Sequence, residues 1–438
     1  MDADTDAKTA DGRERQRLQA RQEAARLTAE GVRAVALGWV DNAGVSRVKT
    51  IPTTRLADAA HHGIGASPVF DVFTSEDAVT SSPHSGGPDG DLRLYPDLDR
   101  LAVLAAQPGW AWAPVDRYDQ QGGPHPGCQR LFARRMAERA AAAGLDLRMG
   151  FETEWIVDPA GDGPAYGLTR VVERSDYLRD LYDALAAQRL EVLQIHPEYT
   201  PGQFEVSTAP ADPVGAADDV VLVRETVRAV SLRHGLRASF APGFTAGQVG
   251  NGCHLHLSAA GLLSGGDGPY GITAAGEAFL AGVLTELPAL LAVGAPSPAS
   301  YLRLEPSRWA GVYRCWGLEN REAALRFIAD EANPNAELKP FDAAANPYLL
   351  VGAVIAAGLA GSGVLPPPVA GDPAGRGGQE RLPVSLTEAA DRFEESAVLR
   401  EALGEVLHGA VLAVRRAEAE RFAKSAPEEI AEATRWRW

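Results

Sequence analysis

The chain has 438 residues, 45% of them hydrophobic and 23% charged, which is enough for more than one domain with a sizeable core. Its formal net charge of -16 argues against nucleic acid as a partner. The three cysteines, Cys128, Cys253 and Cys315, are far apart and odd in number, so they indicate neither a disulfide framework nor a metal knuckle, and they fit a reducing cytoplasm.

The amino-terminal segment is strongly polar. Residues 1–30 contain no apolar run long enough for a signal peptide or a membrane span, so no membrane partner is expected. After a disordered start, residues 13–30 are predicted to form a polar helix that ends at Gly31. Such a helix can be an arm that joins subunits or a solvated tail, and its charge pattern favours the tail.

A small sheet is expected next. Residues 32–40 and 45–51 alternate between apolar and polar side chains, and residues 41–44 have the composition of a hairpin turn between two strands. Residues 120–127 are rich in glycine and resemble a linker. These features divide the chain into a polar segment at 1–30, an amino-terminal domain at 31–119 and a large domain at 120–438.

The large domain is predicted to contain several long helices and glycine-rich loops. Residues 128–143 and 216–234 read as helices, residues 261–271 as a glycine-rich hairpin tip, and residues 365–379 as a Pro/Gly loop. A capping-box pattern then starts at Ser385, and the helical periodicity continues through residue 422.

An acidic strand opens the first candidate site. Residues 150–156 carry apolar side chains on either side of Glu152 and Glu154, which share one face because side chains at i and i+2 point the same way in a strand. Two like charges so close repel each other. Taken alone, the pair is more often part of a solvated edge strand than of a site.

Two further segments favour a site. Residues 196–206 form a strand, a turn and a second strand that add Glu198 and Glu205, and the next strand places His254 and His256 on one face. A lone pair of histidines is usually structural. Several carboxylates and imidazoles on neighbouring strands instead indicate a site for a hard cation such as magnesium or manganese, whereas zinc is not expected without a thiolate pair or a His-Glu-x-x-His motif.

These segments, in this order, resemble the glutamine synthetase family, whose motifs read Gly-x-Glu-x-Glu, Glu-x-x-x-Gly-Gln-x-Glu and Gly-x-His-x-His-x-Ser. Arg303, the pair Asn320 and Arg321, Arg326 and residues 346–349 follow in the family's order. The resemblance implies an α+β fold with a small amino-terminal β-grasp domain and a large catalytic domain built on a curved antiparallel sheet with flanking helices. It also implies a homo-oligomer, a dodecamer of two stacked six-membered rings in which each amino-terminal sheet completes the neighbouring active site.

The resemblance further implies ATP and two divalent ions per active site, Mg²⁺ or Mn²⁺. The ion beside the acceptor carboxylate would be bound by Glu154, Glu198 and Glu205, and the ion on the ATP phosphates by Glu152, His254 and Glu337. The nucleotide would contact His256 and Ser258, glutamate would contact Gly250 and Arg303, and the transferring phosphoryl group would be neutralised by Arg321 and Arg326.

Three departures from the family pattern concern the substrate. Trp309 stands where glutamine synthetases have a flap glutamate that accepts a proton from ammonium, and Gly65 aligns with the segment where they have an ammonium-binding aspartate. Lys339 replaces the usual arginine and keeps the charge without the bidentate fork, so it is assigned a catalytic role while leaving the identity of the acid open. Without the two anions, a small cation is bound poorly, whereas the indole can contact a larger amine.

The expected activity is therefore an ATP-dependent ligase that condenses glutamate with a small organic amine to give a γ-glutamylamide. A glutamine synthetase that uses ammonia and a catalytically silent relative stay open as alternatives. The amine-binding residues would include Trp309, and Glu305 is the nearest candidate in sequence for the base that takes the amine's proton.

Overall fold

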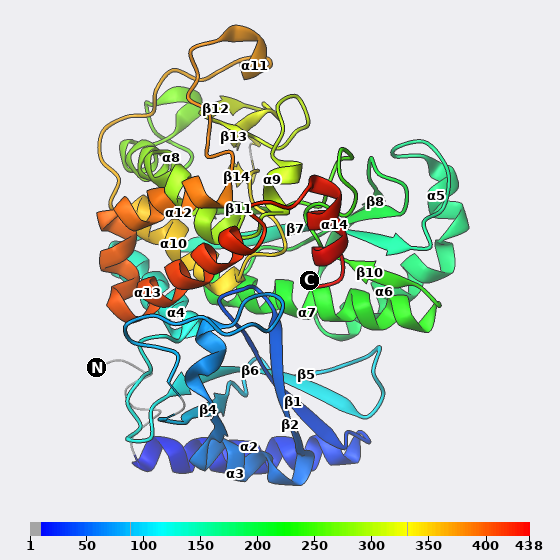
Figure 1. Cartoon of the computed structure of the whole chain (residues 1–438). Coiled ribbons are helices and arrows are strands. Elements are labelled where there is room, and N and C mark those ends of the chain that lie inside the picture. The colour runs from blue at the N-terminus through cyan, green and yellow to red at the C-terminus, as the bar shows by residue number, and fades with distance from the viewer. Residues whose placement is uncertain (1–9, 88, 331) are drawn as a thin grey trace.

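The computed structural model describes residues 10–87, 89–330 and 332–438. Of the disordered start expected before residue 13, residues 1–9 lie outside the described part and residues 10–12 are helical instead. Two sheets organise the molecule, and Figure 1 shows the smaller one below the larger. The smaller sheet has six strands in the order β2-β1-β6-β4-β3, with β5 beside β6. Their bounds are β1 (Ala34–Val40), β2 (Ser46–Pro52), β3 (Ile64–Ala66), β4 (Leu92–Pro96), β5 (Ala102–Val103) and β6 (Trp110–Tyr118).

The smaller sheet has a hairpin, a helix and a central parallel pair. β1 and β2 are antiparallel around the predicted turn, and β1 runs parallel to β6. The helix α3 (Leu56–His62) connects the hairpin to the rest of the sheet and buries Leu56 and Ala59 against it. This arrangement is consistent with the expected β-grasp.

The amino-terminal helix is not a solvated tail. Helix α2 (Ala10–Ala29) lies along α3 beneath the smaller sheet (Figure 1), and Ala20 and Leu27 are fully buried in the core cluster of that sheet. The stripe formed by Ala20, Ala24 and Leu27 follows helical spacing, but it is narrow and made mostly of alanine. For that reason the sequence, dominated here by charged residues, did not predict a buried face on this helix.

The larger sheet has eight strands in the order β12-β13-β14-β11-β7-β9-β8, with β10 beside β7. All its neighbours are antiparallel except β12 and β13, which are parallel. The bounds are β7 (Leu147–Asp158), β8 (Val192–Pro197), β9 (Gln203–Thr208), β10 (Arg237–Ser239), β11 (Cys253–Ala259), β12 (Tyr313–Leu318), β13 (Ala323–Ile328) and β14 (Asn335–Leu338). The three acidic and histidine-bearing strands predicted from sequence are thus β7, β9 and β11.

Helices cover one side of this sheet and enclose the main core (Figure 1). The bounds are α4 (Gln129–Ala142), α5 (Leu168–Glu173), α6 (Ser175–Ala187), α7 (Pro213–Arg233), α8 (Ala274–Gly294), α9 (Ser300–Arg303), α10 (Pro347–Leu359), α11 (Pro373–Arg376), α12 (Leu386–Glu395), α13 (Ala397–Arg421) and α14 (Pro427–Thr434). Helix α8 is long and apolar enough to cross a membrane, but 67% of its most apolar stretch is buried inside the protein, where it packs on α10 and α12.

The predicted helices at 128–143, 216–234 and 385–422 are confirmed, with a break at Ser396 between α12 and α13. The Ser385 side chain accepts the Glu388 backbone N–H, as the capping pattern predicted. The prediction that residues 261–271 form the tip of a β-hairpin is wrong. The backbone folds back on itself through bonds such as Gly266 N–H to the Gly271 carbonyl, but the segment joins strand β11 to helix α8 rather than two strands.

The two sheets share a tight junction. The Asn346 side chain donates to the carbonyl of Val40, and Trp438 Nε1 donates to the carbonyl of Ala43 in the β1–β2 turn. Arg415 Nη1 donates to the carbonyl of Asn42 at 2.7 Å. The domain boundaries at residues 31 and 120 stay a prediction.

Candidate active site

Strand pairing brings the predicted ligands side by side. Glu154 on β7 is the register partner of Glu205 on β9, and Glu152 is the partner of His254 on β11. His256 is in turn the partner of Glu337 on β14. Four adjacent strands therefore present their acidic and imidazole side chains to one region, because each ligand follows the period of its strand.

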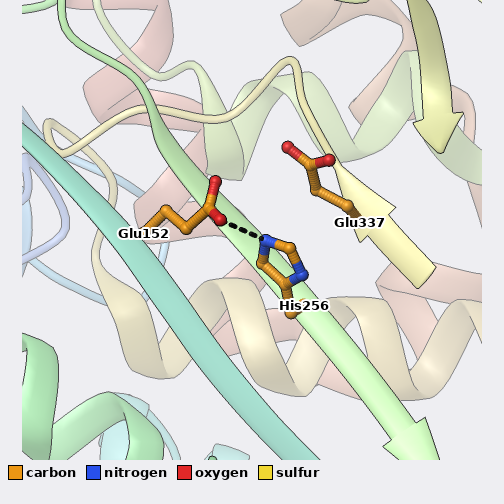
Figure 2. Close-up of side chains that lie close together, drawn as sticks. All are labelled: Glu152, His256 and Glu337. Atoms are coloured by element: carbon orange, nitrogen blue, oxygen red, sulfur yellow. Dashed lines mark ion pairs between the residues drawn. The ribbon is translucent and has the colours of Figure 1, made fainter. Parts of the chain in front are cut away.

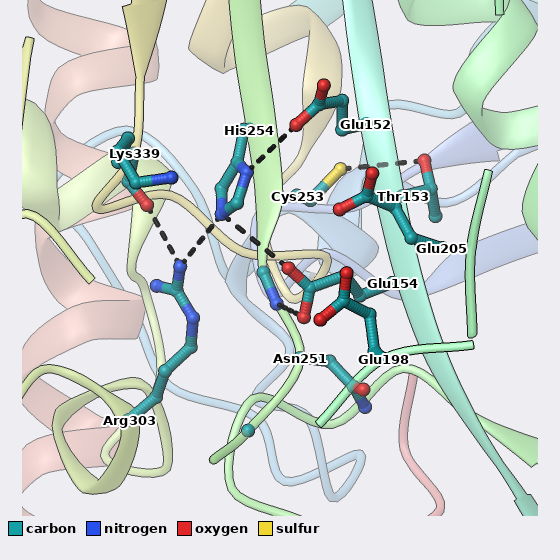
Figure 3. A network of polar contacts seen from close by, with 12 residues as sticks. Glu152, Thr153, Glu154, Glu198, Glu205, Asn251, Cys253, His254, Arg303 and Lys339 are labelled. Atoms are coloured by element: carbon teal, nitrogen blue, oxygen red, sulfur yellow. Dashed lines mark hydrogen bonds and ion pairs between the residues drawn. The ribbon is translucent and has the colours of Figure 1, made fainter. Parts of the chain in front are cut away.

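This region is a cavity of about 570 Å³. Figure 3 shows its polar network, with Glu154, Glu198 and Glu205 on one side and His254, Arg303 and Lys339 on the other. Eleven of the predicted site residues line it: Glu152, Glu154, Glu198, Glu205, Gly250, His254, Arg303, Trp309, Arg321, Arg326 and Lys339. Glu337 is buried next to Lys339 and His254.

The first ligand group is an excess of buried negative charge. Glu154, Glu198 and Glu205 are only 8%, 6% and 6% exposed. Burial, followed by the charge of Glu154, raises the pKa of Glu198 to about 7. His196 lies 3.4 Å from Glu198 and 3.2 Å from Glu205, so its protonated form compensates the charge of both.

The second ligand group combines carboxylates and imidazoles. Ligand atoms of Glu152, His256 and Glu337 all lie within 4.8 Å of one another, and Figure 2 shows the ion pair between Glu152 and His256. His254 Nδ1 is 3.2 Å from both Glu152 and Glu337. Burial opposes protonation of His256, but its contacts with Glu152 raise its pKa to about 9.

Both groups fit divalent hard cations. Carboxylate oxygens dominate, an imidazole nitrogen is available in each, and three separate sets of three ligand atoms lie close enough to share an ion. A cation would also relieve the repulsion that keeps Glu198 partly protonated. The structure adds His196 and His256 to the residues that can take part in binding.

Arg303 and Lys339 join the two groups. Arg303 is 6% exposed, and its guanidinium donates to the carbonyls of Lys339 and Pro340 and lies 3.2 Å from His254 Nε2. Lys339 is 3% exposed, with its ammonium 3.0 Å from Glu337 Oε1. Lys339, which stands where the family usually has arginine, thus lines the cavity and forms a buried ion pair with Glu337.

The two predicted phosphoryl-binding arginines also face the cavity. Arg326 Nη1 is 3.2 Å from Glu337, and Nη2 is 2.6 Å from Glu319 at the surface. Arg321 lies on the turn between β12 and β13 and lines the same wall. Their placement brings two further cations to the side of the cavity that carries Glu337.

Trp309 lies on a short irregular segment between α9 and β12, the predicted flap. Its backbone N–H donates to Glu322 Oε1 at 2.7 Å, and its indole stacks on the ring of Tyr199. Among the described residues, those that line the cavity do not include Glu305, which is close to Arg381 instead. The suggestion that Glu305 is the base is therefore not supported by its position.

A second cavity of about 490 Å³ lies on the other side of Glu152. Its lining includes His256 and Ser258, the two residues assigned to the nucleotide, together with apolar side chains such as Phe151 and Leu193. Because Glu152 lines both cavities, a molecule in the second one can reach the ligand groups of the first. The assignment of His256 and Ser258 to the nucleotide stays a prediction.

Several cavity residues were missed by sequence reasoning. His196 and Tyr199 belong to the second motif segment and line the cavity, and the fully buried Gln203 of the same segment donates from Nε2 to Glu154 Oε2 at 2.8 Å. Tyr166 comes from the loop before α5 and donates its hydroxyl to Glu198 Oε1 at 2.6 Å. The motif could have indicated the first three, whereas no signal in the chain points to Tyr166.

Comparisons with known proteins identify relatives along nearly the whole chain. The model of the glutamine synthetase catalytic domain matches residues 126–433. Gamma-glutamylpolyamine synthetase GlnA3 of Streptomyces coelicolor is 53% identical over 94% of this chain and 95% of its own length. Glutamine synthetase of Halobacterium salinarum is 29% identical over 86% of this chain and 88% of its own length.

Solved structures show the same fold. A crystal structure of a novel glutamine synthase homologue superposes with a TM-score of 0.85 at 33% identity, over 93% of this chain and 99% of that one. The ADP complex of GmaS superposes with a TM-score of 0.82 at 29% identity, over 92% and 96% of the two chains. With a matching catalytic-domain model, a relative above 50% identity along nearly the whole length and a shared fold, this chain belongs to the glutamine synthetase family.

Proposed function

We propose that this chain is an ATP-dependent ligase that joins the γ-carboxylate of glutamate to an organic amine of the polyamine class. The observation that carries the proposal is one cavity with carboxylates at its floor and the indole of Trp309 at its flap. The relative that is 53% identical is named a γ-glutamylpolyamine synthetase, which supports the same choice of substrate.

The reaction has two steps, and in each step one bond forms and one bond breaks. An oxygen of the glutamate γ-carboxylate attacks the terminal phosphorus of ATP, the bond from that phosphorus to ADP breaks, and an acyl phosphate forms. The amine nitrogen then attacks the acyl carbon with its lone pair, the bond from that carbon to the phosphate oxygen breaks, and the nitrogen gives up a proton that the released phosphate can accept. Phosphoryl transfer of this kind depends on positioning and on neutralising charge.

The ligand groups supply the positions for divalent ions. When bound, the ions neutralise phosphate charge and polarise the reacting carboxylate. We propose two ions per site, Mg²⁺ or Mn²⁺, held by Glu154, Glu198 and Glu205 on one side and by Glu152, His254 and Glu337 on the other. The mostly oxygen ligands support that choice of metal.

The cationic side chains have distinct tasks. Arg303, together with the backbone at Gly250, would bind the α-carboxylate of glutamate, because its guanidinium is fixed in the cavity by backbone carbonyls. Arg321 and Arg326 would neutralise the transferring phosphoryl group from the opposite wall. Lys339 would hold Glu337 in its charged form and add positive charge near the acyl phosphate.

The flap supports an organic amine over ammonium. Ammonium is strongly hydrated, so a site must replace its water with fixed anions. At the flap the side chain that faces the cavity is an indole, while the carboxylate of Glu322 lies behind it and accepts the Trp309 N–H. An alkyl amine can instead bury methylene groups on the ring and place its charge over the ring face.

Ammonia remains the alternative substrate, because the relatives at 27–29% identity are named glutamine synthetases. A silent relative is disfavoured by the intact ligand groups and by the paired Lys339. We further propose that the protein forms a homo-oligomer. We also propose that it lies in the cytoplasm, because its three cysteines are unpaired and buried, as expected in a reducing compartment.

The test is phosphate release with glutamate, ATP and Mg²⁺ against ammonium, methylamine, 1-butylamine, 1,4-diaminobutane and spermidine, with the product identified by mass. We expect the highest kcat/KM for a diamine or triamine and a γ-glutamylamide as product. A higher kcat/KM for ammonium would establish the glutamine synthetase alternative. No phosphate release above that of a Glu337→Gln variant with any amine would establish a silent relative.

A further inference from the structure

Three solvent-exposed aromatic side chains gather at the mouth of the main cavity. Tyr166, Tyr199 and Trp309 are 50%, 37% and 38% exposed, and all three line the cavity. Large exposed apolar side chains are individually common, but a group of them in a concave region marks a ligand-binding surface. The mouth is therefore aromatic, whereas the floor is acidic.

The three rings contact one another, with Tyr199 in the middle. Tyr199 stacks on Trp309 with ring centroids 4.2 Å apart and planes inclined by 13°. Tyr166 meets Tyr199 edge to face at 5.5 Å and stacks on His196 at 5.2 Å. Tyr199 thus connects the flap to the loop before α5, and without its ring Trp309 loses this neighbour.

The flap backbone at this point is strained. Trp309 has φ of 59° and Ser307 has φ of 57°, a left-handed conformation that side chains other than glycine rarely adopt. Such a conformation persists only where the surrounding contacts fix it. Here the contacts include the bond from the Trp309 N–H to Glu322 and the stack on Tyr199, so the orientation of the indole depends partly on Tyr199.

The aromatic wall begins where the acidic floor ends. Tyr199 directly follows Glu198 in the chain, and the Tyr166 hydroxyl donates to Glu198 Oε1 at 2.6 Å. A ligand that spans floor and wall therefore needs a cationic head and an apolar stem. A linear aliphatic diamine or polyamine has both, whereas an amine that also carries a carboxylate would bring a negative charge to the buried glutamates.

We infer that Tyr199 is a specificity-determining residue for the amine, resting on the proposed function above. Its ring, fixed against Trp309, forms a wall for the methylene chain of a linear diamine or polyamine whose reacting amino group lies near Glu198. A second ammonium group further along the chain lies against the exposed ring faces of the wall, where the π system attracts a cation. No family motif found in the sequence assigns Tyr199 a role.

The experiment measures the ratio of kcat/KM for 1,4-diaminobutane to kcat/KM for methylamine. Tyr199→Ala should lower this ratio about tenfold or more, in the range that contacts to a few methylene groups and one charge contribute. Tyr199→Leu should retain part of the preference for 1-butylamine over methylamine but lose the preference for the diamine over 1-butylamine, because it keeps apolar area without a ring. Tyr199→Phe should restore the ratio.

Tyr182 provides a matched control. It is a tyrosine 40% exposed on α6, outside the lining of the cavity, and Tyr182→Ala should leave the ratio at the wild-type value. The KM for glutamate, measured with methylamine in each variant, separates amine recognition from damage to the site. We expect the KM for glutamate to change less than about threefold, since Tyr199 is proposed to contact the amine and not glutamate.

Two results overturn the assignment of Tyr199 while leaving the proposed function in place: an unchanged ratio in Tyr199→Ala, or equal losses for both amines with a raised KM for glutamate. If Tyr199→Ala does not fold, the same reading is taken from Tyr199→Leu. A wild-type enzyme that forms no γ-glutamylamide with any amine overturns the proposed function itself, and the assignment with it.

Discussion

At the scale of single residues, the site concentrates negative charge that the protein balances only in part. Glu337 has Lys339, His254 and Arg326 around it, and although burial opposes ionisation, Lys339 and His254 hold its pKa well below the usual range. Glu198 has His196 at 3.4 Å and the Tyr166 hydroxyl as partners, but burial with the charge of Glu154 still raises its pKa. The group that contains Glu198 is therefore where a divalent ion changes the electrostatics most.

The first prediction concerns the carboxylates proposed to bind the metal ions. Glu154→Gln should lower kcat about 100-fold or more, because it removes charge from an ion site beside the reacting carboxylate. The fold should persist, since the glutamine oxygen can still accept from the Gly252 N–H, at 2.9 Å in the wild type. Thermal melting and turnover measured on the same preparation check both parts.

Two comparisons sharpen this test. Glu154→Ala should also abolish turnover, but it leaves the buried Gly252 N–H without its acceptor, at about 1–3 kcal/mol of stability, while Gln203 keeps the Gly250 carbonyl. EDTA should abolish activity and Mg²⁺ or Mn²⁺ should restore it. Normal turnover in EDTA would show that the assigned ligands hold no required ion.

The second prediction concerns Lys339. Lys339→Ala should cost about 2–4 kcal/mol of transition-state stabilisation, in the range found for loss of one charge-stabilising donor. Lys339→Arg should be tolerated or improve turnover, because the buried charge next to Glu337 is kept. The measurement is kcat/KM for glutamate at saturating amine. An alanine variant with wild-type kinetics would place Lys339 outside the chemistry.

The third prediction concerns Trp309. Trp309→Glu should raise kcat/KM for ammonium relative to that for 1,4-diaminobutane, since it supplies an anion and removes the apolar face. Trp309→Phe should keep the preference for the diamine because it keeps a ring. Competition between ammonium and the diamine, followed by product mass, gives the ratio directly. The same preference in Trp309→Glu as in wild type would remove the flap's assigned role.

At the scale of secondary-structure elements, irregular segments complete what the strands begin. The flap is held to three neighbours: the Ser307 hydroxyl donates to Asp372 at 2.6 Å, Arg308 donates to the Gly247 carbonyl, and the Trp309 N–H donates to Glu322. Asp372 belongs to the Pro/Gly loop predicted at 365–379, which includes the short helix α11. That loop is therefore a support of the flap in this fold.

The fourth prediction uses the buried face of α2. Leu27 is fully buried, so Leu27→Ala should lower the free energy of unfolding by about 2–4 kcal/mol, as for other buried leucines. Leu18 is 50% exposed on the same helix, and Leu18→Ala should change the free energy of unfolding by less than about 0.5 kcal/mol. Urea denaturation of both variants tests the pair. Equal and negligible effects of the two substitutions would show that this helix is a solvated tail after all.

At the scale of the whole molecule, the smaller sheet is tied to the larger unit through the β1–β2 turn. Arg415, Asn346 and Trp438 all donate to backbone carbonyls of that turn or its flanks. The junction fixes where the smaller sheet points. We propose that it presents the edge with Gly65 to a neighbouring subunit, in two stacked rings of six.

The fifth prediction tests that assembly. A chain that starts at Cys128 should lose activity, because it lacks the sheet proposed to complete the neighbouring site, while the full chain should elute as a large oligomer. The truncation also removes the partners of Arg415 and Asn346, so folding is checked by circular dichroism. Light scattering that shows an active monomer of the full chain would contradict the ring proposal.

The sequence by itself determined which side chains share a face. The spacing of Glu152 and Glu154, and of His254 and His256, is fixed by the two-residue period of a strand, and this period follows from covalent geometry. The order of the motifs then indicated the family and, through it, the proposed ligand groups. The charge at Lys339 and the indole at Trp309 follow directly from the residues at those positions. All of these are local properties of the chain.

Only the tertiary structure decided which distant segments meet. Tyr166 reaches Glu198 from a loop that no motif marks, Tyr199 meets Trp309 only because the flap folds onto it, and the apolar face of α2 is buried only because α3 and the smaller sheet pack against it. Such contacts depend on packing between elements far apart in sequence. A single chain carries no periodic or motif signal for them, because their energy comes from burial after the elements have docked.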